Sequence, residues 1–329
     1  MSNPFVNQSV VDLNKDLGRQ QYPLARAEEL QTSFALVFSR HLGCLQSGRR
    51  FEARSMLVTG LSGSGKSTEI EGMLKRFKEC EVPLPSGVPA DFAECLLASK
   101  GSWKDLGKKT LHAIGYPLSD TTRKTQFEIW DLVVRQAKLK GIVGIHYDEA
   151  QHIMRDKSDK EVLAILDAFK TLMKSHEWPL MLILSGVPEL DSYVQREPQL
   201  DRLLSRVTFA EIDLCSAPGQ LAPDYTVLHE IVGSYAMSAG LEVDPGLQTG
   251  DFLHRLATAG GFRWGIVIDI VVDAVAHAVG RMGGFLTPED FVAAWVNKTK
   301  MNELATPFTH EAYERVFRNQ TLFRSKIGS

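Results

Sequence analysis

A glycine-rich segment near residue 60 has the residue types and the spacing of a phosphate-binding loop. The run Gly60-Leu-Ser-Gly-Ser-Gly-Lys66-Ser67 fits G-x-x-x-x-G-K-[ST] and lies between an expected strand and an expected helix. Gly63 and Gly65 let backbone N–H groups turn toward phosphate oxygens, and the helix N-terminus adds its positive dipole end. The Lys66 ammonium can reach the β- and γ-phosphates, and the Ser67 hydroxyl can ligate Mg²⁺. The residues expected to contact the nucleotide are Gly60, Ser62, Gly63, Ser64, Gly65, Lys66, Ser67 and Thr68.

Two adjacent carboxylates follow a second apolar run, Ile142-Val-Gly-Ile-His-Tyr-Asp148-Glu149. Successive residues leave the end of a strand in different directions. Asp148 can therefore hold Mg²⁺ while Glu149 polarises an attacking water. Taken alone, such a pair is more often a helix cap with a first-turn acid. Together with the phosphate loop, it predicts a site that hydrolyses ATP or GTP.

The elements that must position these residues alternate between apolar runs and helical spacing. Strands are expected at 55–60, 91–99, 141–150, 179–186 and 207–214, and helices at 26–47, 66–78, 102–115, 124–139 and 159–176. This alternation predicts an α/β domain at 26–215 with a parallel five-stranded sheet covered by helices on both faces.

The alternation of strand and helix patterns ends after Cys215. A Pro/Gly-rich linker follows, and then helical patterns at 224–239, 247–259, 263–280 and 288–299. We therefore expect a small all-helical domain at 216–300. A polar N-terminal arm is expected at 1–25, and a basic, flexible C-terminal tail at 301–329.

Composition and charge exclude several classes of protein. The 329 residues are 44% hydrophobic and carry a net charge of −3, which fits a globular chain without a strongly basic coat for nucleic acid. The four cysteines form no CxxC pair and the histidines have no metal-binding spacing, so neither a zinc site nor a disulfide framework is expected. The start lacks a secretory signal, and Asp269, Asp273 and His277 interrupt the most apolar stretch. We expect a cytoplasmic protein without a membrane span.

The order of these parts resembles the AAA+ ATPases of the initiator-like clade. The resemblance implies that Ser185, at the end of the fourth strand, senses the γ-phosphate. It also implies that Arg206, with Arg202 as the second choice, reaches into the site of a neighbouring subunit. An arginine of the helical lid, here Arg263, would touch the phosphates. The segment that begins at Tyr22-Pro23 would border the adenine.

Within this clade the sequence resembles the TniB/TnsC transposition ATPases. The segments that carry the likeness are MLVTGLSGSGKST, YDEAQHI, SGVPEL and the run from PQL to SRV before the fifth strand. The resemblance implies ATP and Mg²⁺ as cofactors, a homo-oligomer in the form of a ring or a helical filament, and sequence-independent binding of double-stranded DNA. It further implies partners that select a target site and a transposase that receives it.

A local basic segment is the expected DNA contact. Residues 100–124 hold six lysines and arginines against two aspartates, and the resembled family sends a helical insertion toward DNA at this place. The candidate contacts are Lys100, Lys104, Arg123 and Lys124; a solvated helix face is the alternative reading of this charge run. A helicase is rejected, because too few residues follow position 215 for a second ATPase domain. A secretion or cell-envelope ATPase and a nucleotide-switch adaptor without DNA binding remain the alternative functions.

Overall fold

The computed structural model describes residues 22–97, 101–119, 121–215 and 222–317, with a few single positions before Tyr22. It divides into two compact units. The α/β unit comprises Leu24–Ser62 and Lys66–Phe209, and the helical unit comprises Met1–Pro23, Gly63–Gly65 and Ala210–Ser329.

The α/β unit is built on a five-stranded sheet whose strands all run parallel, in the order β2-β3-β4-β1-β5. The strands are β1 (Ser55–Gly60), β2 (Asp91–Leu96), β3 (Ile142–Asp148), β4 (Met181–Gly186) and β5 (Leu204–Phe209). Every residue of β1, β3 and β4 is buried, as expected for central strands covered on both faces. The predicted parallel five-stranded sheet is therefore confirmed.

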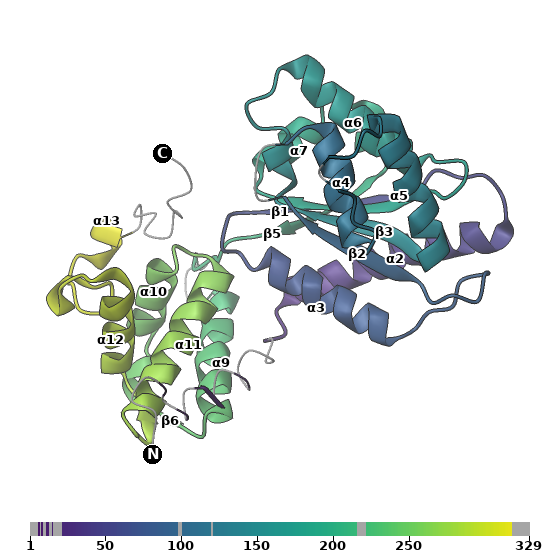
Figure 1. Ribbon diagram of the computed structural model, residues 1–329. Coiled ribbons are helices and arrows are strands. Elements are labelled where there is room, and N and C mark those ends of the chain that lie inside the picture. The colour runs from purple at the N-terminus through teal and green to yellow at the C-terminus, as the bar shows by residue number, and fades with distance from the viewer. Residues whose placement is uncertain are drawn as a thin grey trace. The chain divides into compact units, whose positions relative to one another are not determined.

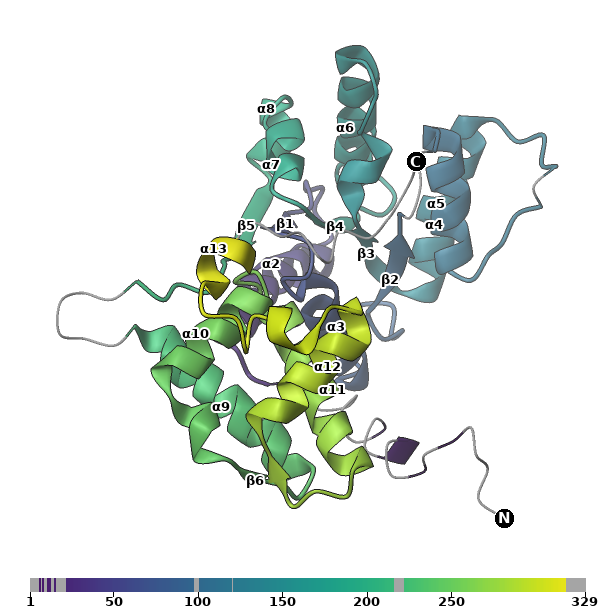
Figure 2. The same cartoon turned by 90° about the vertical axis from the view of Figure 1, so that its left-hand side faces the viewer.

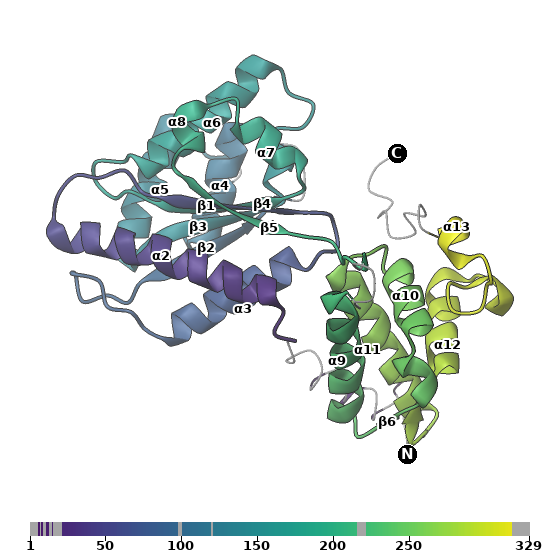
Figure 3. The same ribbon diagram turned by 180° about the vertical axis from the view of Figure 1, so that it is seen from behind.

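Helices cover both faces of this sheet (Figures 1 and 3). The helices α2 (Ala25–Ser47) and α3 (Lys66–Glu79) lie on one face. The opposite face carries α4 (Trp103–Ala113), α5 (Gln126–Lys140) and α6 (Asp159–Met173), and the short elements are η1 (Ala150–Ile153), α7 (Glu189–Val194) and α8 (Pro198–Asp201). Capping boxes fix the starts of α4, α5 and α6, where Ser102, Thr125 and Ser158 accept hydrogen bonds from the first turn.

The helical unit is a bundle of helices (Figure 2). They are α9 (Pro223–Ser238), η2 (Pro245–Gln248), α10 (Gly250–Ala259), α11 (Trp264–Gly280), α12 (Pro288–Thr299), η3 (Glu303–Ala305) and α13 (Tyr313–Phe317). A two-residue strand β6 (Glu242–Val243) pairs in parallel with β7 (Phe285–Leu286). The prediction of an all-helical domain missed this ribbon, because two-residue strands carry no periodicity.

A buried carboxylate ties α11 to α12 in this unit. Asp290, only 1% exposed, accepts hydrogen bonds from His277 Nδ1 at 2.8 Å and from Arg281 Nε and Nη2, each at 2.7 Å. The backbone N–H of Thr287 donates to it at 2.9 Å. Burial alone would raise the pKa of Asp290, but these hydrogen bonds outweigh it and lower the pKa to about 2.

Two expectations need correction. The fifth strand spans Leu204–Phe209 rather than 207–214, because Ser55 of β1 pairs with Leu204 and the chain leaves the sheet after Phe209. Residues 303–317 belong to the folded bundle rather than to a flexible tail, since Tyr313 and Phe317 are buried. Most of the expected N-terminal arm, and the chain after Phe317, lie outside the described residues. No helix in the described ranges is long and apolar enough to cross a membrane.

Candidate nucleotide-binding and hydrolysis site

The phosphate loop connects the end of β1 to the start of α3. Gly63 and Gly65 have φ angles of +80° and +94°, which glycine adopts without strain. Lys66 opens α3 and is buried, and its Nζ donates to the carbonyl oxygens of Gly60 at 2.8 Å and Leu61 at 3.0 Å. Burial lowers the pKa of Lys66, while the nearby carboxylates Asp148 and Glu149 oppose that shift. The ammonium is therefore held inside the loop, where phosphate oxygens could replace the carbonyls as acceptors.

The predicted metal ligands lie together. Asp148 is the last residue of β3, and its Oδ2 accepts a hydrogen bond from Ser67 Oγ at 2.7 Å. Its Oδ1 accepts from Ser185 Oγ at 2.6 Å and from the backbone N–H of Glu149 at 3.0 Å. A hydroxyl and a carboxylate are oxygen ligands of the kind Mg²⁺ prefers, with substrate phosphates and waters completing its shell. These residues fit a magnesium–nucleotide complex.

Glu149 follows directly and is held by two neighbours. It has a left-handed backbone, with φ +55°, which turns its side chain away from the direction of the strand. Its Oε2 accepts a hydrogen bond from Gln151 Nε2 and lies 3.7 Å from His152 Nε2. Gln151 is buried against Gly186, where any Cβ would overlap its Oε1. The candidate general base is thus placed by a residue that the sequence analysis did not single out.

Ser185 lies within β4 and is fully buried, one residue before the end of the strand. Its hydroxyl donates to Asp148, and His146 Nε2 lies 2.9 Å away on its other side. The structure therefore brings Ser185 to the metal side of the site. Its sensing of a γ-phosphate stays a prediction.

Arg26 is a further charged residue near the loop. Its guanidinium lies over the ring of Phe209, 5.0 Å from the centroid. Its Nε and Nη1 are buried without a hydrogen-bond partner among the described residues. Burial lowers the pKa of Arg26 to about 10, and the Coulombic attraction of Glu69 on α3 opposes that shift. The sequence showed Arg26 only as part of the upstream segment, because its burial depends on the position of β5.

The two candidate arginines for a neighbouring subunit are both engaged within the α/β unit. Arg206 is the third residue of β5 rather than a residue before it. Its Nε donates to Asp191 Oδ1 at 2.9 Å, and its Nη2 binds Asp201. Arg202 Nη2 lies 3.1 Å from Glu52 Oε2. Either arginine would have to exchange these carboxylates to act on another subunit.

Three of the predicted site residues, Tyr22, Pro23 and Arg263, belong to the helical unit. Arg263 precedes α11, and burial lowers its pKa, with Glu211 opposing. The Tyr22 hydroxyl donates to Glu230 on α9. Burial, reinforced by that hydrogen bond, raises the pKa of Tyr22 to about 12. Pro23 is exposed.

The predicted DNA contacts lie around the starts of α4 and α5. Lys104 is in the first turn of α4, while Arg123 and Lys124 are exposed just before α5. Lys124 and Lys104 both act electrostatically on Glu128, so the two helix starts bring them to one surface. Lys100 lies outside the described residues.

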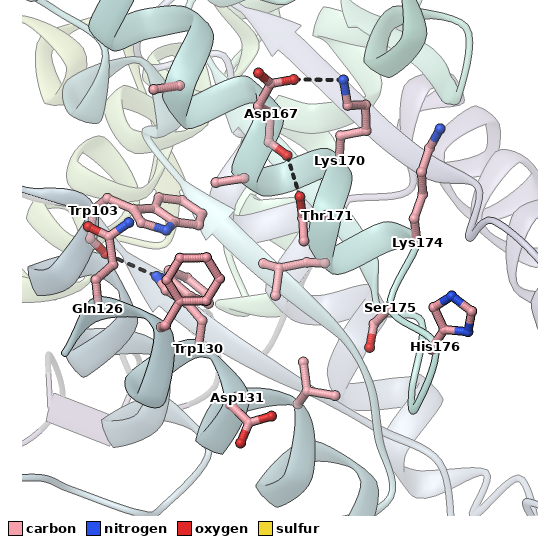
Figure 4. Close-up of a pocket in the computed structure, with 15 residues that line it drawn as sticks. Trp103, Gln126, Trp130, Asp131, Asp167, Lys170, Thr171, Lys174, Ser175 and His176 are labelled. Carbon is pink, nitrogen blue, oxygen red and sulfur yellow. Dashed lines mark hydrogen bonds and ion pairs between the residues drawn. The ribbon is translucent and has the colours of Figure 1, made fainter. Parts of the chain in front are cut away.

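A separate pocket of about 630 Å³ is lined by residues of α4, α5 and α6 and of the turn after α6 (Figure 4). Trp103 and Trp130 stack on one side, with ring centroids 4.1 Å apart, and Asp167 pairs with Lys170 on the other. None of the predicted nucleotide or DNA contacts lines this pocket.

Comparison with known proteins identifies the fold. Residues 49–194 match the family described as an AAA domain, and no curated protein matches the sequence. Among solved structures, Cdc6p from Pyrobaculum aerophilum is 12% identical over 85% of this chain and 70% of its own, with a TM-score of 0.58. The Aeropyrum pernix ORC1 protein, in complex with DNA, is 16% identical over 88% of this chain and 69% of its own, with a TM-score of 0.61. The ORC2 protein of the same organism, in ADPNP–ADP complexes, is 14% identical over 88% and 72%, with a TM-score of 0.56.

At these identities the solved structures establish a shared architecture. The family match covers the phosphate loop, the metal-side carboxylate and the candidate general base, which the structure assembles around Lys66, Asp148 and Glu149. The chain therefore has the AAA+ fold, its residues 49–194 match an AAA domain, and it is an ATPase.

Proposed function

We propose that this protein is an ATP-dependent, DNA-binding oligomeric regulator of transposition, which hydrolyses ATP with Mg²⁺ and delivers target DNA to a partner transposase. The observation that carries the proposal is the hydrolysis site formed by Lys66, Ser67 and Asp148 on the AAA+ fold, with Glu149 beside it. The transposition role is supported by the sequence resemblance to the TniB/TnsC group. One of the segments that carry this resemblance, YDEAQHI, includes Asp148 and Glu149.

Each residue of the site has a distinct task in this proposal. The Lys66 ammonium binds the β- and γ-phosphates, and Ser67 with Asp148 would hold Mg²⁺, which neutralises charge that develops on the phosphates. Glu149 accepts a proton from the attacking water and so activates it. An arginine of a neighbouring subunit, Arg206 or Arg202, would complete the site, so that hydrolysis depends on assembly into a ring or a filament.

Binding of double-stranded DNA is proposed for the surface formed by Lys104, Arg123 and Lys124. The Aeropyrum pernix ORC1 protein, which shares the fold, was solved in complex with DNA. In an oligomer each subunit needs only a few phosphate contacts, because many subunits share one duplex. Phosphate contacts position a protein without reading bases, so binding would be nearly independent of sequence.

The test is the affinity for a fluorescent duplex, measured by anisotropy with ATP, with ADP and without nucleotide across a salt series. Binding should require ATP, and the Lys104→Glu/Lys124→Glu variant should bind more weakly with a shallower salt dependence. The Lys75→Glu/Lys160→Glu variant is the control, because it makes the same charge change at two exposed positions on α3 and α6.

Equal affinity of both charge variants and the wild type, with ATP hydrolysis intact, would move the DNA site elsewhere on the chain. Wild-type protein that binds no duplex under any nucleotide condition would contradict DNA binding itself. The adaptor function would then become the better explanation.

A further inference from the structure

A buried histidine lies beside the metal side of the site. His146 is two residues before Asp148 on β3, so both side chains are on the same face of the sheet. It is 2% exposed, although the phosphate loop and the acid pair require no histidine there. Its ring is approached at both nitrogens: Nε2 lies 2.9 Å from Ser185 Oγ, and Nδ1 lies 3.6 Å from Glu94 Oε2 on β2.

The direction of these hydrogen bonds follows from counting protons. The Ser185 hydroxyl has a single proton, and it is donated to the carboxylate oxygen Oδ1 of Asp148 at 2.6 Å. The Ser185 oxygen is then an acceptor toward His146, which must carry a proton on Nε2. The order of donation therefore runs from His146 to Ser185 and on to Asp148.

This order decides which carboxylate oxygen of Asp148 faces Ser67. Ser185 and the backbone N–H of Glu149 occupy Oδ1, whereas Oδ2 is directed to Ser67. The Ser185 hydroxyl has an alternative acceptor, the carbonyl oxygen of Tyr147 at 3.5 Å. Without a donor at His146, the hydroxyl could turn toward that carbonyl and release Oδ1.

We infer that His146 is a positioning residue for ATP hydrolysis, which acts through Ser185 to fix Asp148 Oδ2 toward Ser67 and Mg²⁺. The inference rests on the magnesium site proposed above. Outer partners that orient a metal ligand commonly contribute 10- to 100-fold to metal affinity or activity. His146 would have this role from a buried position inside β3.

The experiment measures the affinity for a fluorescent ATP analogue in Mg²⁺ and in EDTA, together with kcat and KM for ATP. His146→Ala should lose on the order of tenfold in the Mg²⁺-dependent part of the affinity and in kcat, with its affinity in EDTA unchanged. His146→Gln should recover most of the loss, because its amide nitrogen can take the place of Nε2. His146→Asn should not, since its amide is too short to reach Ser185.

His41→Ala is the matched control. His41 is also a 2% exposed histidine of the α/β unit, on α2, and neither of its ring nitrogens has a partner among the described residues. This variant shows what removal of a buried imidazole does to folding, and it should keep the wild-type Mg²⁺ dependence.

The outcomes separate the inference from the metal site. Rescue by glutamine but not by asparagine, confined to the Mg²⁺ series, would establish the positioning role. If the wild type binds the ATP analogue equally well in Mg²⁺ and in EDTA, the metal site and the inference are both overturned. Two outcomes would overturn the inference alone, provided that the wild type binds the analogue more tightly in Mg²⁺. In the first, His146→Ala keeps the Mg²⁺-dependent affinity of the wild type. In the second, His146→Ala loses as much affinity in EDTA as in Mg²⁺.

Discussion

Replacing Asp290 by asparagine tests how much one buried carboxylate stabilises the helical unit. The change keeps the shape of the side chain but removes the charge that Arg281 and His277 contact. The pKa of Asp290 falls from an ordinary 3.8 to about 2, and each unit of pKa corresponds to about 1.4 kcal/mol. The ionised form is therefore favoured in the folded state by about 2 kcal/mol, and Asp290→Asn should lower the free energy of unfolding by about that much at pH 7.

The sign of the pH dependence follows from the lowered pKa. A carboxylate whose folded pKa lies below its unfolded value stabilises the fold at pH values above 3.8. That contribution disappears as the pH falls from about 4 toward about 2. The difference between wild type and Asp290→Asn should thus be constant near neutral pH and should narrow over this acidic range.

Amide hydrogen exchange of α11 and α12 is the appropriate measurement, because it reports on this unit alone and α6 serves as an internal reference. Asp273→Asn is the control: Asp273 is exposed on α11 and pairs with Lys298 of α12 at 3.2 Å, an interaction worth about 1 kcal/mol at most. Equal protection of α11 and α12 in Asp290→Asn and in the control would refute the reasoning.

Three further predictions concern the α/β unit. Glu149→Gln should bind ATP as the wild type does but release phosphate on the order of 10²- to 10⁴-fold more slowly, and undiminished turnover would contradict its role as general base. Gly186→Ala should lower the free energy of unfolding by about 1–3 kcal/mol and slow turnover, because the new Cβ displaces Gln151; chemical denaturation and ATPase rates would measure both effects. Thr125→Ala should cost about 1 kcal/mol and increase hydrogen exchange in the first turn of α5, where it removes one half of a capping box, and unchanged exchange there would argue against the cap.

The sequence predicted the parts of the site that are continuous in the chain. The loop from Gly60 to Ser67 and the acids Asp148 and Glu149 lie at strand ends, as their patterns indicated. An apolar run that ends in glycine or in acidic residues can be recognised in the sequence alone. Such a run forms a strand in the structure, because a parallel sheet buries it along its whole length.

The contacts that could not be predicted from the sequence depend on how the strands pair. His146 meets Ser185 because β3 pairs with β4, and no spacing along the chain encodes that pairing. Arg206 falls inside β5 because Ser55 pairs with Leu204, which moves the start of the strand three residues earlier than its apolar pattern implied. Such partners are chosen by tertiary packing rather than by local propensity.

The strand order has a mechanical consequence for how the site could communicate with a neighbouring subunit. Because β4 lies between β1 and β3, the two strands that carry the phosphate loop and the acid pair do not pair with each other, and each pairs with β4. The chain continues from β4 into α7, whose Asp191 holds the guanidinium of Arg206. A shift of β4 in response to the nucleotide would therefore move the carboxylate of Asp191, which accepts a hydrogen bond from Arg206. Through this short stretch of chain, the nucleotide bound at one site could determine how readily Arg206 leaves Asp191 for the site of a neighbouring subunit.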